Sequence, residues 1–156
     1  MTPDDARSTD GLPANAAVLG YAGLLPFIAG ALGTVALDDL DQAEWAGRLL
    51  VLYGAVILSF LGGVHWGVAL APNATRQKRL LVMGVVPSLV GWGSLALPYD
   101  QSLVVQIAGF GFFWLYENRA LGERVLPRAY LDLRRRLTAV ACSSLAIALI
   151  GSSDLS

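Results

Sequence analysis

The sequence predicts an all-α integral membrane protein, a bundle of five transmembrane helices with its N-terminus in the cytoplasm and its C-terminus outside. Hydrophobic residues make up 55% of the 156-residue chain and charged residues only 15%, against about 25% charged in a typical soluble domain. The apolar residues fall into blocks long enough to cross a bilayer, and the basic residues gather in alternate loops. This composition excludes a soluble globular domain, a nucleic-acid-binding protein and a disordered chain.

Residues 1–15 are predicted to form a polar, mobile N-terminal tail. Three aspartates against the single basic residue Arg7 do not fit the basic n-region of a secretory signal or the arginine-rich pattern of a mitochondrial presequence. The first predicted span, residues 16–37, is therefore expected to be an uncleaved helix. Within it, Pro26 lacks a backbone N–H and leaves the carbonyl of Ala22 without its helical donor, which predicts a kink.

The other four predicted spans are apolar runs separated by polar turns. A spanning helix needs about 20 mostly apolar residues, and strands are excluded because the runs are long and lack a two-residue alternation. The third span contains Pro87, a second predicted kink. These spans are residues 49–71, 80–97, 102–118 and 135–151, which complete a single domain over residues 16–151, followed by a C-terminal tail at 152–156.

Basic residues distinguish the two ends of the predicted bundle. Ten of the eleven lie on one side: Arg7 in the tail, three in the loop after the second span and six around the loop after the fourth. Only Arg48 lies on the other side. The positive-inside rule places the basic side in the cytoplasm, which gives the predicted orientation of both termini.

Three consecutive arginines, Arg134, Arg135 and Arg136, precede the fifth span. In one interpretation they only fix the orientation of the helix. In the other they also bind anionic lipid headgroups, to which each would contribute about 1 kcal/mol near a charged leaflet. The overall charge bias favours the first interpretation.

The second span carries the single histidine, His65. In a helical projection Gly62 shares a stripe with His65, whereas Gly63 and Gly67 lie almost opposite. Glycines on both faces allow close helix packing from two sides, so we expect this span to be central and His65 to point into the bundle. His65 then either titrates or binds a ligand, or it ties helices together through one hydrogen bond.

The fourth span presents an inward face that begins at Gln106 and ends at Glu117, with aromatic residues between them. The second and fourth spans both end on the cytoplasmic side, so His65 is expected at a depth similar to the end of this face. We predict a polar or ligand-binding pocket, open to the cytoplasm, made of His65, Trp66, Trp114, Glu117 and Asn118. In an alternative interpretation, Glu117 simply pairs with Arg119 or Arg124 at the level of the headgroups.

No catalytic residue, metal site or cofactor is predicted. One histidine and one cysteine, Cys142, cannot supply a metal site of several imidazoles or thiolates within the chain. A haem with two histidine ligands would need a second chain. The sequence also lacks a phosphate-binding glycine loop and the Gly-x-Ser-x-Gly motif of serine hydrolases.

Three stretches resemble a known family. They are Leu-Ser-Phe-Leu-Gly-Gly-Val-His-Trp-Gly at 58–67, Phe-Trp-Leu-Tyr-Glu at 113–117 and Leu-Gly-Tyr-Ala-Gly-Leu-Leu-Pro-Phe at 19–27. Across residues 16–150 the chain is similar to the uncharacterised membrane protein family that includes mitochondrial transmembrane protein 69. The resemblance implies a multi-pass inner-membrane protein of bacteria or mitochondria and carries over no activity. The acidic N-terminus favours a bacterial inner membrane.

These observations favour a non-enzymatic binding or assembly module, acting within a membrane complex or for a small hydrophobic ligand. The expected partners are the lipid bilayer and other membrane subunits or further copies of this chain, and no nucleic acid. The alternative is a small proton-linked transporter that titrates His65 and uses Pro26 and Pro87 as hinges. A membrane enzyme with His65 and Glu117 as acid and base is the third hypothesis, and no nucleophile or metal set accompanies these two residues.

Overall fold

The computed structural model describes residues 14–71, 77–121 and 127–153, and every regular element in these residues is a helix. The predicted all-α class is therefore confirmed. α1 and α2 together occupy the place of the first predicted span. In chain order the helices are α1 (Ala14–Ala22), α2 (Leu25–Ala36), α3 (Leu40–Leu70), α4 (Gln77–Ser94), α5 (Tyr99–Tyr116), the π-helix η1 (Glu117–Leu121) and α7 (Arg128–Ser153).

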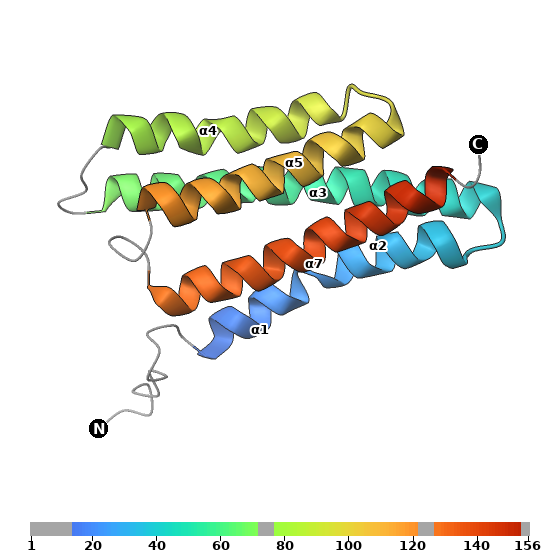
Figure 1. The fold of residues 1–156 in the computed structure, drawn as a ribbon, viewed down its shortest axis with the longest axis horizontal. Coiled ribbons are helices and arrows are strands. Elements are labelled where there is room, and N and C mark those ends of the chain that lie inside the picture. The colour runs from blue at the N-terminus through green and yellow to red at the C-terminus, as the bar shows by residue number, and fades with distance from the viewer. Residues whose placement is uncertain (1–13, 72–76, 122–126, 154–156) are drawn as a thin grey trace.

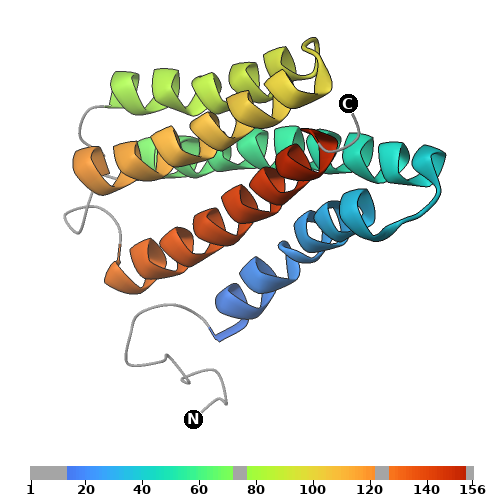
Figure 2. The ribbon, with the colours of Figure 1, turned by 45° about the vertical axis from the view of Figure 1, so that its right-hand side comes forward.

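The helices form a bundle in which successive long helices run antiparallel (Figure 1). α3 packs on α2, α4 and α5, and α7 packs on α5, α2 and α1. Both views show α7 between α5 and the α1–α2 pair (Figure 1; Figure 2). The starts of α4 and α7 and the ends of α3 and α5 thus lie together. We call this the basic end, because it holds the described residues Lys78, Arg79, Arg119, Arg128 and Arg134 to Arg136.

Two helices begin well before the apolar runs that predicted them. α3 starts at Leu40 instead of residue 49 because Asp39 caps it: its carboxylate accepts hydrogen bonds from the backbone N–H groups of Asp41 and Gln42, at 3.0 and 3.2 Å. The acidic segment that separates the first two apolar runs is thus the cap and first turn of a helix, where carboxylates are favoured by the helix dipole. α7 likewise begins at Arg128 instead of residue 135, so the arginine triplet is helical.

The first predicted span is interrupted at Gly23 and Leu24. α1 ends before these residues and α2 begins after them, with Pro26 in the first turn of α2, where a missing N–H removes no hydrogen bond. The Tyr53 hydroxyl of α3 donates a hydrogen bond of 2.8 Å to the Gly23 carbonyl. A neighbouring helix therefore satisfies the backbone at the break. Pro87, by contrast, lies inside α4, which continues past it.

Glycines allow α3 and α4 to approach until their backbones touch. A Cβ atom on Gly62 would overlap the carbonyl oxygen of Gly84, and one on Gly91 would lie 2.8 Å from the carbonyl oxygen of Ala55. Such close approach is typical of helices that associate in membranes. Gly63 and Gly67 differ, because a Cβ placed on either meets no described atom within 4 Å apart from the adjacent residues and backbone of its own helix. Of the three glycines predicted for packing, the structure brings only Gly62 against another helix.

The surface of the bundle is apolar and its interior holds polar groups. Phe60 is 70% exposed and Leu89 is 59% exposed, while the side chains of His65, Gln106 and Glu117 are fully buried. A soluble protein has the reverse pattern, and exposed apolar faces of this extent mark a surface that contacts lipid or protein. Two stretches of the described residues, Asn15–Ala36 and Leu40–Leu70, are long and apolar enough to cross a membrane by length and composition.

Replacing Gly62 by alanine is expected to lower the free energy of unfolding by about 1–3 kcal/mol, because the backbone of α4 leaves no room for a methyl group. The matched control is the next residue, Gly63, where alanine meets open space and is expected to stabilise the helix by up to about 1 kcal/mol. Thermal unfolding of both variants in the same detergent measures the difference. Equal effects at the two positions would contradict the packing described above.

Candidate functional site

Glu117 lies at the junction of α5 and the π-helix η1, on the buried face of α5 that also holds Phe113. At Tyr116 the α5 helix gives way to the π-helix η1, and the Glu117 backbone N–H bonds to the carbonyls of Phe113 and Trp114. Single π-turns of this kind occur frequently at functional sites because they redirect one side chain. The Glu117 side chain, four residues after the buried Phe113, is fully buried.

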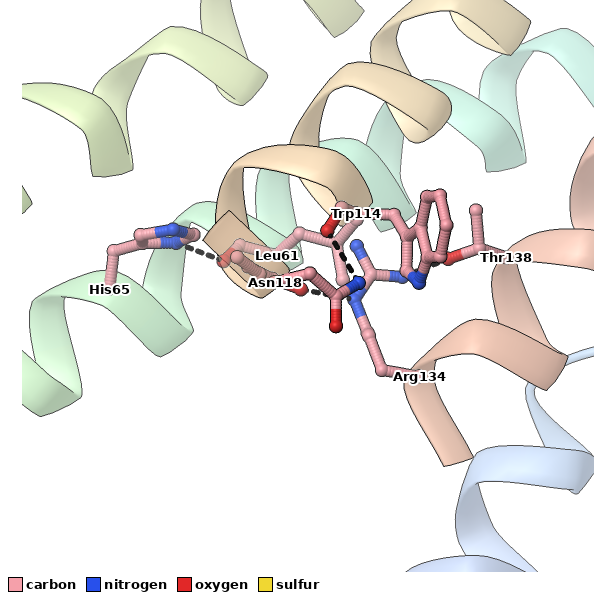
Figure 3. A network of polar contacts seen from close by, with 7 residues as sticks. Leu61, His65, Trp114, Asn118, Arg134 and Thr138 are labelled. Atoms are coloured by element: carbon pink, nitrogen blue, oxygen red, sulfur yellow. Dashed lines mark hydrogen bonds and ion pairs between the residues drawn. The ribbon is translucent and has the colours of Figure 1, made fainter. Parts of the chain in front are cut away.

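Arg134 of α7 pairs with this buried carboxylate. Its Nε donates to Glu117 Oε2 at 2.9 Å, and its Nη1 donates to Thr138 Oγ1, one turn further along α7, at 2.8 Å (Figure 3). Only 6% of Arg134 is exposed. Charge-assisted hydrogen bonds in such surroundings are strong, but each charge also loses its hydration. Glu117 Oε1 and Arg134 Nη2 have no hydrogen-bond partner among the described residues.

This pairing corrects two predictions. Arg134 does not extend toward lipid headgroups, because its side chain is turned into the bundle to meet Glu117. Glu117 does not pair with Arg119; its partner is Arg134, and Arg124 lies outside the described residues. The other two arginines of the triplet, Arg135 and Arg136, are exposed, and Arg135 pairs with Asp132 on its own helix at 3.4 Å.

His65 is fully buried near the same end, on α3. Its Nδ1 lies 3.2 Å from the Leu61 carbonyl oxygen (Figure 3). The centroid of its ring lies 5.7 Å from that of Tyr116 and 6.3 Å from that of Phe113. A carbonyl accepts only, so this contact assigns the proton of the neutral ring to Nδ1. Nε2 is then an acceptor, and it has no partner among the described residues.

Trp114 and Asn118 occupy the face of α5 and η1 next to Glu117. The Asn118 side-chain amide donates to the Trp114 carbonyl at 3.0 Å (Figure 3), and the Trp114 indole N–H is buried without a partner among the described residues. Trp66 is not part of this group. It is 45% exposed and its ring lies against Gly84 of α4. The structure thus brings together Trp114, Glu117 and Asn118 and adds Arg134 and Thr138. His65 lies near this group, against the rings of Phe113 and Tyr116, and makes no hydrogen bond to it within the described residues, while Trp66 lies on a different face.

The sequence analysis did not place Arg134 and Thr138 in this group, because it interpreted the arginine triplet as an orientation marker or as a binder of lipid headgroups. A helical projection extended past residue 135 contains the signal: the buried residues of α7 recur every three or four positions, and Arg134 begins that series. They are Arg134, Thr138, Ala141, Ser144, Leu145 and Ala148. Tyr130 also lies near the pair: burial raises its pKa to about 12, and the Glu117 charge adds to this effect. Tyr130 therefore stays protonated across the physiological pH range.

We call His65, Trp114, Glu117, Asn118, Arg134 and Thr138 the polar cluster, and four of its buried polar atoms have no hydrogen-bond partner among the described residues. Arg134 Nη2 and Trp114 Nε1 are donors, and Glu117 Oε1 and His65 Nε2 are acceptors. Among the described residues no set of three or more His, Cys, Asp or Glu side chains is arranged to hold a metal ion. The arrangement suits recognition of a polar group in an otherwise apolar setting.

Comparison with known proteins gives the family. Residues 12–150 match the family described as "Protein of unknown function (DUF3429)". The chain is 36% identical over 155 residues to transmembrane protein 69 of Xenopus tropicalis, an alignment that covers 96% of this chain and 59% of the frog protein. The chain thus spans less than two thirds of the length of that relative, and no solved structure matches it. The resemblance stated from the sequence motifs is confirmed: the protein is a helical membrane protein that belongs to the DUF3429 family, together with transmembrane protein 69.

Proposed function

We propose that this chain is a five-span protein of a bacterial inner membrane, with its N-terminus in the cytoplasm and its C-terminus outside. The apolar outer faces of the helices support the spanning arrangement. The antiparallel order of the helices supports the orientation, because it brings the described arginines and lysines of three separate segments to one end. On this proposal the basic end faces the cytoplasm.

Reporter fusions test this topology. A reporter active only outside the cytoplasm is expected to give signal when fused after residue 153 and none when fused in the loop at 72–76. Reversing the charge of the basic end, by replacing Lys78, Arg79 and Arg128 with glutamate, is expected to weaken this difference. A cytoplasmic C-terminus in the wild-type protein would contradict the proposed orientation.

We propose that the biochemical role is non-enzymatic binding, in which the polar cluster holds the hydrogen-bonding group of a small hydrophobic ligand or of a partner subunit. The observation that carries the proposal is that four buried polar atoms, from α3, α5, η1 and α7, have no partner among the described residues. A buried donor or acceptor without a partner costs about 1–3 kcal/mol. A bound polar group that satisfies several of them would therefore gain affinity in a site that water reaches poorly.

Variants of the buried Glu117–Arg134 pair are used to distinguish a binding role of the polar cluster from a purely structural one. Glu117→Gln is expected to cost about 3–5 kcal/mol of unfolding free energy, because it leaves the Arg134 charge buried and unpaired. The double variant Glu117→Leu/Arg134→Leu removes both charges and is expected to recover most of this loss. The matched control is the exposed pair of Glu44 and Arg48, where a single neutral substitution is expected to cost less than about 1 kcal/mol.

Capture from native membranes completes this test. Tagged wild-type protein, extracted in mild detergent, is expected to retain a lipid-soluble molecule or a membrane subunit that mass spectrometry identifies, and the stable double-leucine variant is expected to lose it. Arg135→Gln, which alters an exposed neighbour, is expected to retain it. Recovery of the free protein alone from wild-type membranes, or equal capture by the double variant, would contradict the binding proposal.

The transporter remains the second candidate because of one observation, the broken helix between α1 and α2. Discontinuous helices form the binding and gating elements of many transporters. In proteoliposomes this function predicts proton flux that rises with the imposed pH gradient and is abolished by His65→Gln, which keeps a hydrogen bond but cannot titrate. Flux that is absent at every pH would exclude the transporter.

A further inference from the structure

A cavity of about 220 Å³ lies at the end of the bundle opposite the polar cluster. It is bounded by the end of α2, the start of α3, the start of α5 and the end of α7, at the right-hand side of the bundle in Figure 1. No residue of the polar cluster lines it. Anything proposed for this cavity is therefore independent of the function proposed above.

Small residues create the space. Ala43 and Gly47 of α3 and Ala148 of α7 line the cavity and are buried, and none of them carries a side chain long enough to fill it. The volume exceeds the roughly 150 Å³ of an engineered cavity that binds benzene and is smaller than the roughly 300 Å³ at which drug-sized sites begin. The cavity therefore matches a single ring with a small substituent.

Tyr99 supplies one polar atom to this apolar lining. Its ring packs on Gly47, where a Cβ atom would lie 2.7 Å from the Tyr99 hydroxyl oxygen. That oxygen is buried and has no hydrogen-bond partner among the described residues. Burial, with a smaller contribution from the Asp100 charge, raises the pKa of Tyr99 to about 12, so the phenol keeps its proton at neutral pH. It is therefore able to donate one hydrogen bond to an acceptor held in the cavity.

The other polar side chains around the cavity already have partners. Ser152 Oγ donates to Asp100 Oδ1 at 2.7 Å, and Thr34 Oγ1 donates to the Ala31 carbonyl at 2.8 Å. Glu44 and Arg48 pair with each other on the exposed rim. Among the described lining residues, the Tyr99 hydroxyl is thus the buried polar side-chain atom left to select a ligand.

We propose that this cavity is a second binding site, for a small uncharged ring compound that carries one carbonyl group, with the carbonyl oxygen accepting a hydrogen bond from Tyr99. The ring fills the space between Ala43, Gly47 and Ala148, and the absence of a charge follows from the apolar lining. A charged ligand would lose its hydration there without gaining a counter-ion inside the cavity.

Binding of 4-fluoroacetophenone, followed by fluorine NMR with the full chain in nanodiscs, tests the site. Wild-type protein is expected to bind it saturably, and Tyr99→Phe is expected to weaken binding about fivefold, the effect of one ordinary hydrogen bond. The matched probe 4-fluoro-α-methylstyrene has a CH₂ group in place of the carbonyl oxygen, so its affinity is expected to be the same in both proteins. Tyr99→Phe removes no hydrogen bond made within the described residues, so the variant is expected to fold.

Two further variants control for partition of the probes into lipid. Ala43→Leu fills the cavity and is expected to abolish saturable binding of both probes, whereas Arg135→Gln changes an exposed residue at the basic end and is expected to leave binding unchanged. If Ala43→Leu does not fold, Ala148→Val provides a smaller filling substitution with the same expected direction. Absence of saturable binding to the wild type, equal loss of both probes in Tyr99→Phe, or retention of a phospholipid in the cavity by the wild type alone would each overturn the proposal.

Discussion

The apolar outer surface of the helices is the constraint on which the rest of this structure depends. In hydrocarbon no water is present to satisfy a donor or acceptor, so each polar group must find its partner within the bundle. Three solutions are visible. The Tyr53 hydroxyl bonds to the carbonyl at the break between α1 and α2. Gln106, fully buried on α5, donates to the Val51 carbonyl at 2.8 Å and to Ser94 Oγ at 3.0 Å. Arg134 meets Glu117. Each solution joins two or more helices, so the same polar groups that are costly to bury also specify which helices are neighbours.

α3 supplies the surface on which these contacts converge. Three of its glycines lie at intervals of seven or eight residues, and each receives a different neighbour: Gly47 receives the Tyr99 ring, Gly54 receives the Gln106 amide and Gly62 receives the α4 backbone. A larger residue at any of the three would displace a group that has little freedom to move. The polar side chains of α5 reach α3 only because these positions have no Cβ atom. The same three glycines of α3 therefore allow both the close packing of helices and the burial of polar side chains from α5.

The fold class followed from composition, because a chain with so few charges and such long apolar runs has few structures available to it. The inward direction of His65 and Glu117 followed from helical spacing. The residues at which the helices start were harder to predict. Asp39 caps α3 through its side chain, whereas a hydropathy scale shows only that aspartate is polar. The inward direction of the Arg134 side chain was harder still to predict. The other two arginines of the triplet are exposed, and the packing of α7 against α5 and η1, a long-range contact, brings Arg134 alone to Glu117.

The two ends of the bundle have different interiors: the basic end buries an ion pair, and the opposite end contains a cavity between small apolar residues. This difference bears on function. A buried ion pair contributes little net stability, since an apolar pair of similar volume often does as well or better. The basic end nevertheless keeps charges inside and leaves one oxygen and one nitrogen of the pair without partners among the described residues. At the other end small apolar residues leave space, which forfeits the dispersion contacts that filled packing would provide.

Both features lower the stability of the isolated chain relative to a filled, uncharged core. Local departures from the most stable packing are the places where proteins commonly bind other molecules. α3 extends along both, so a ligand at either end would contact the same helix that holds the bundle together.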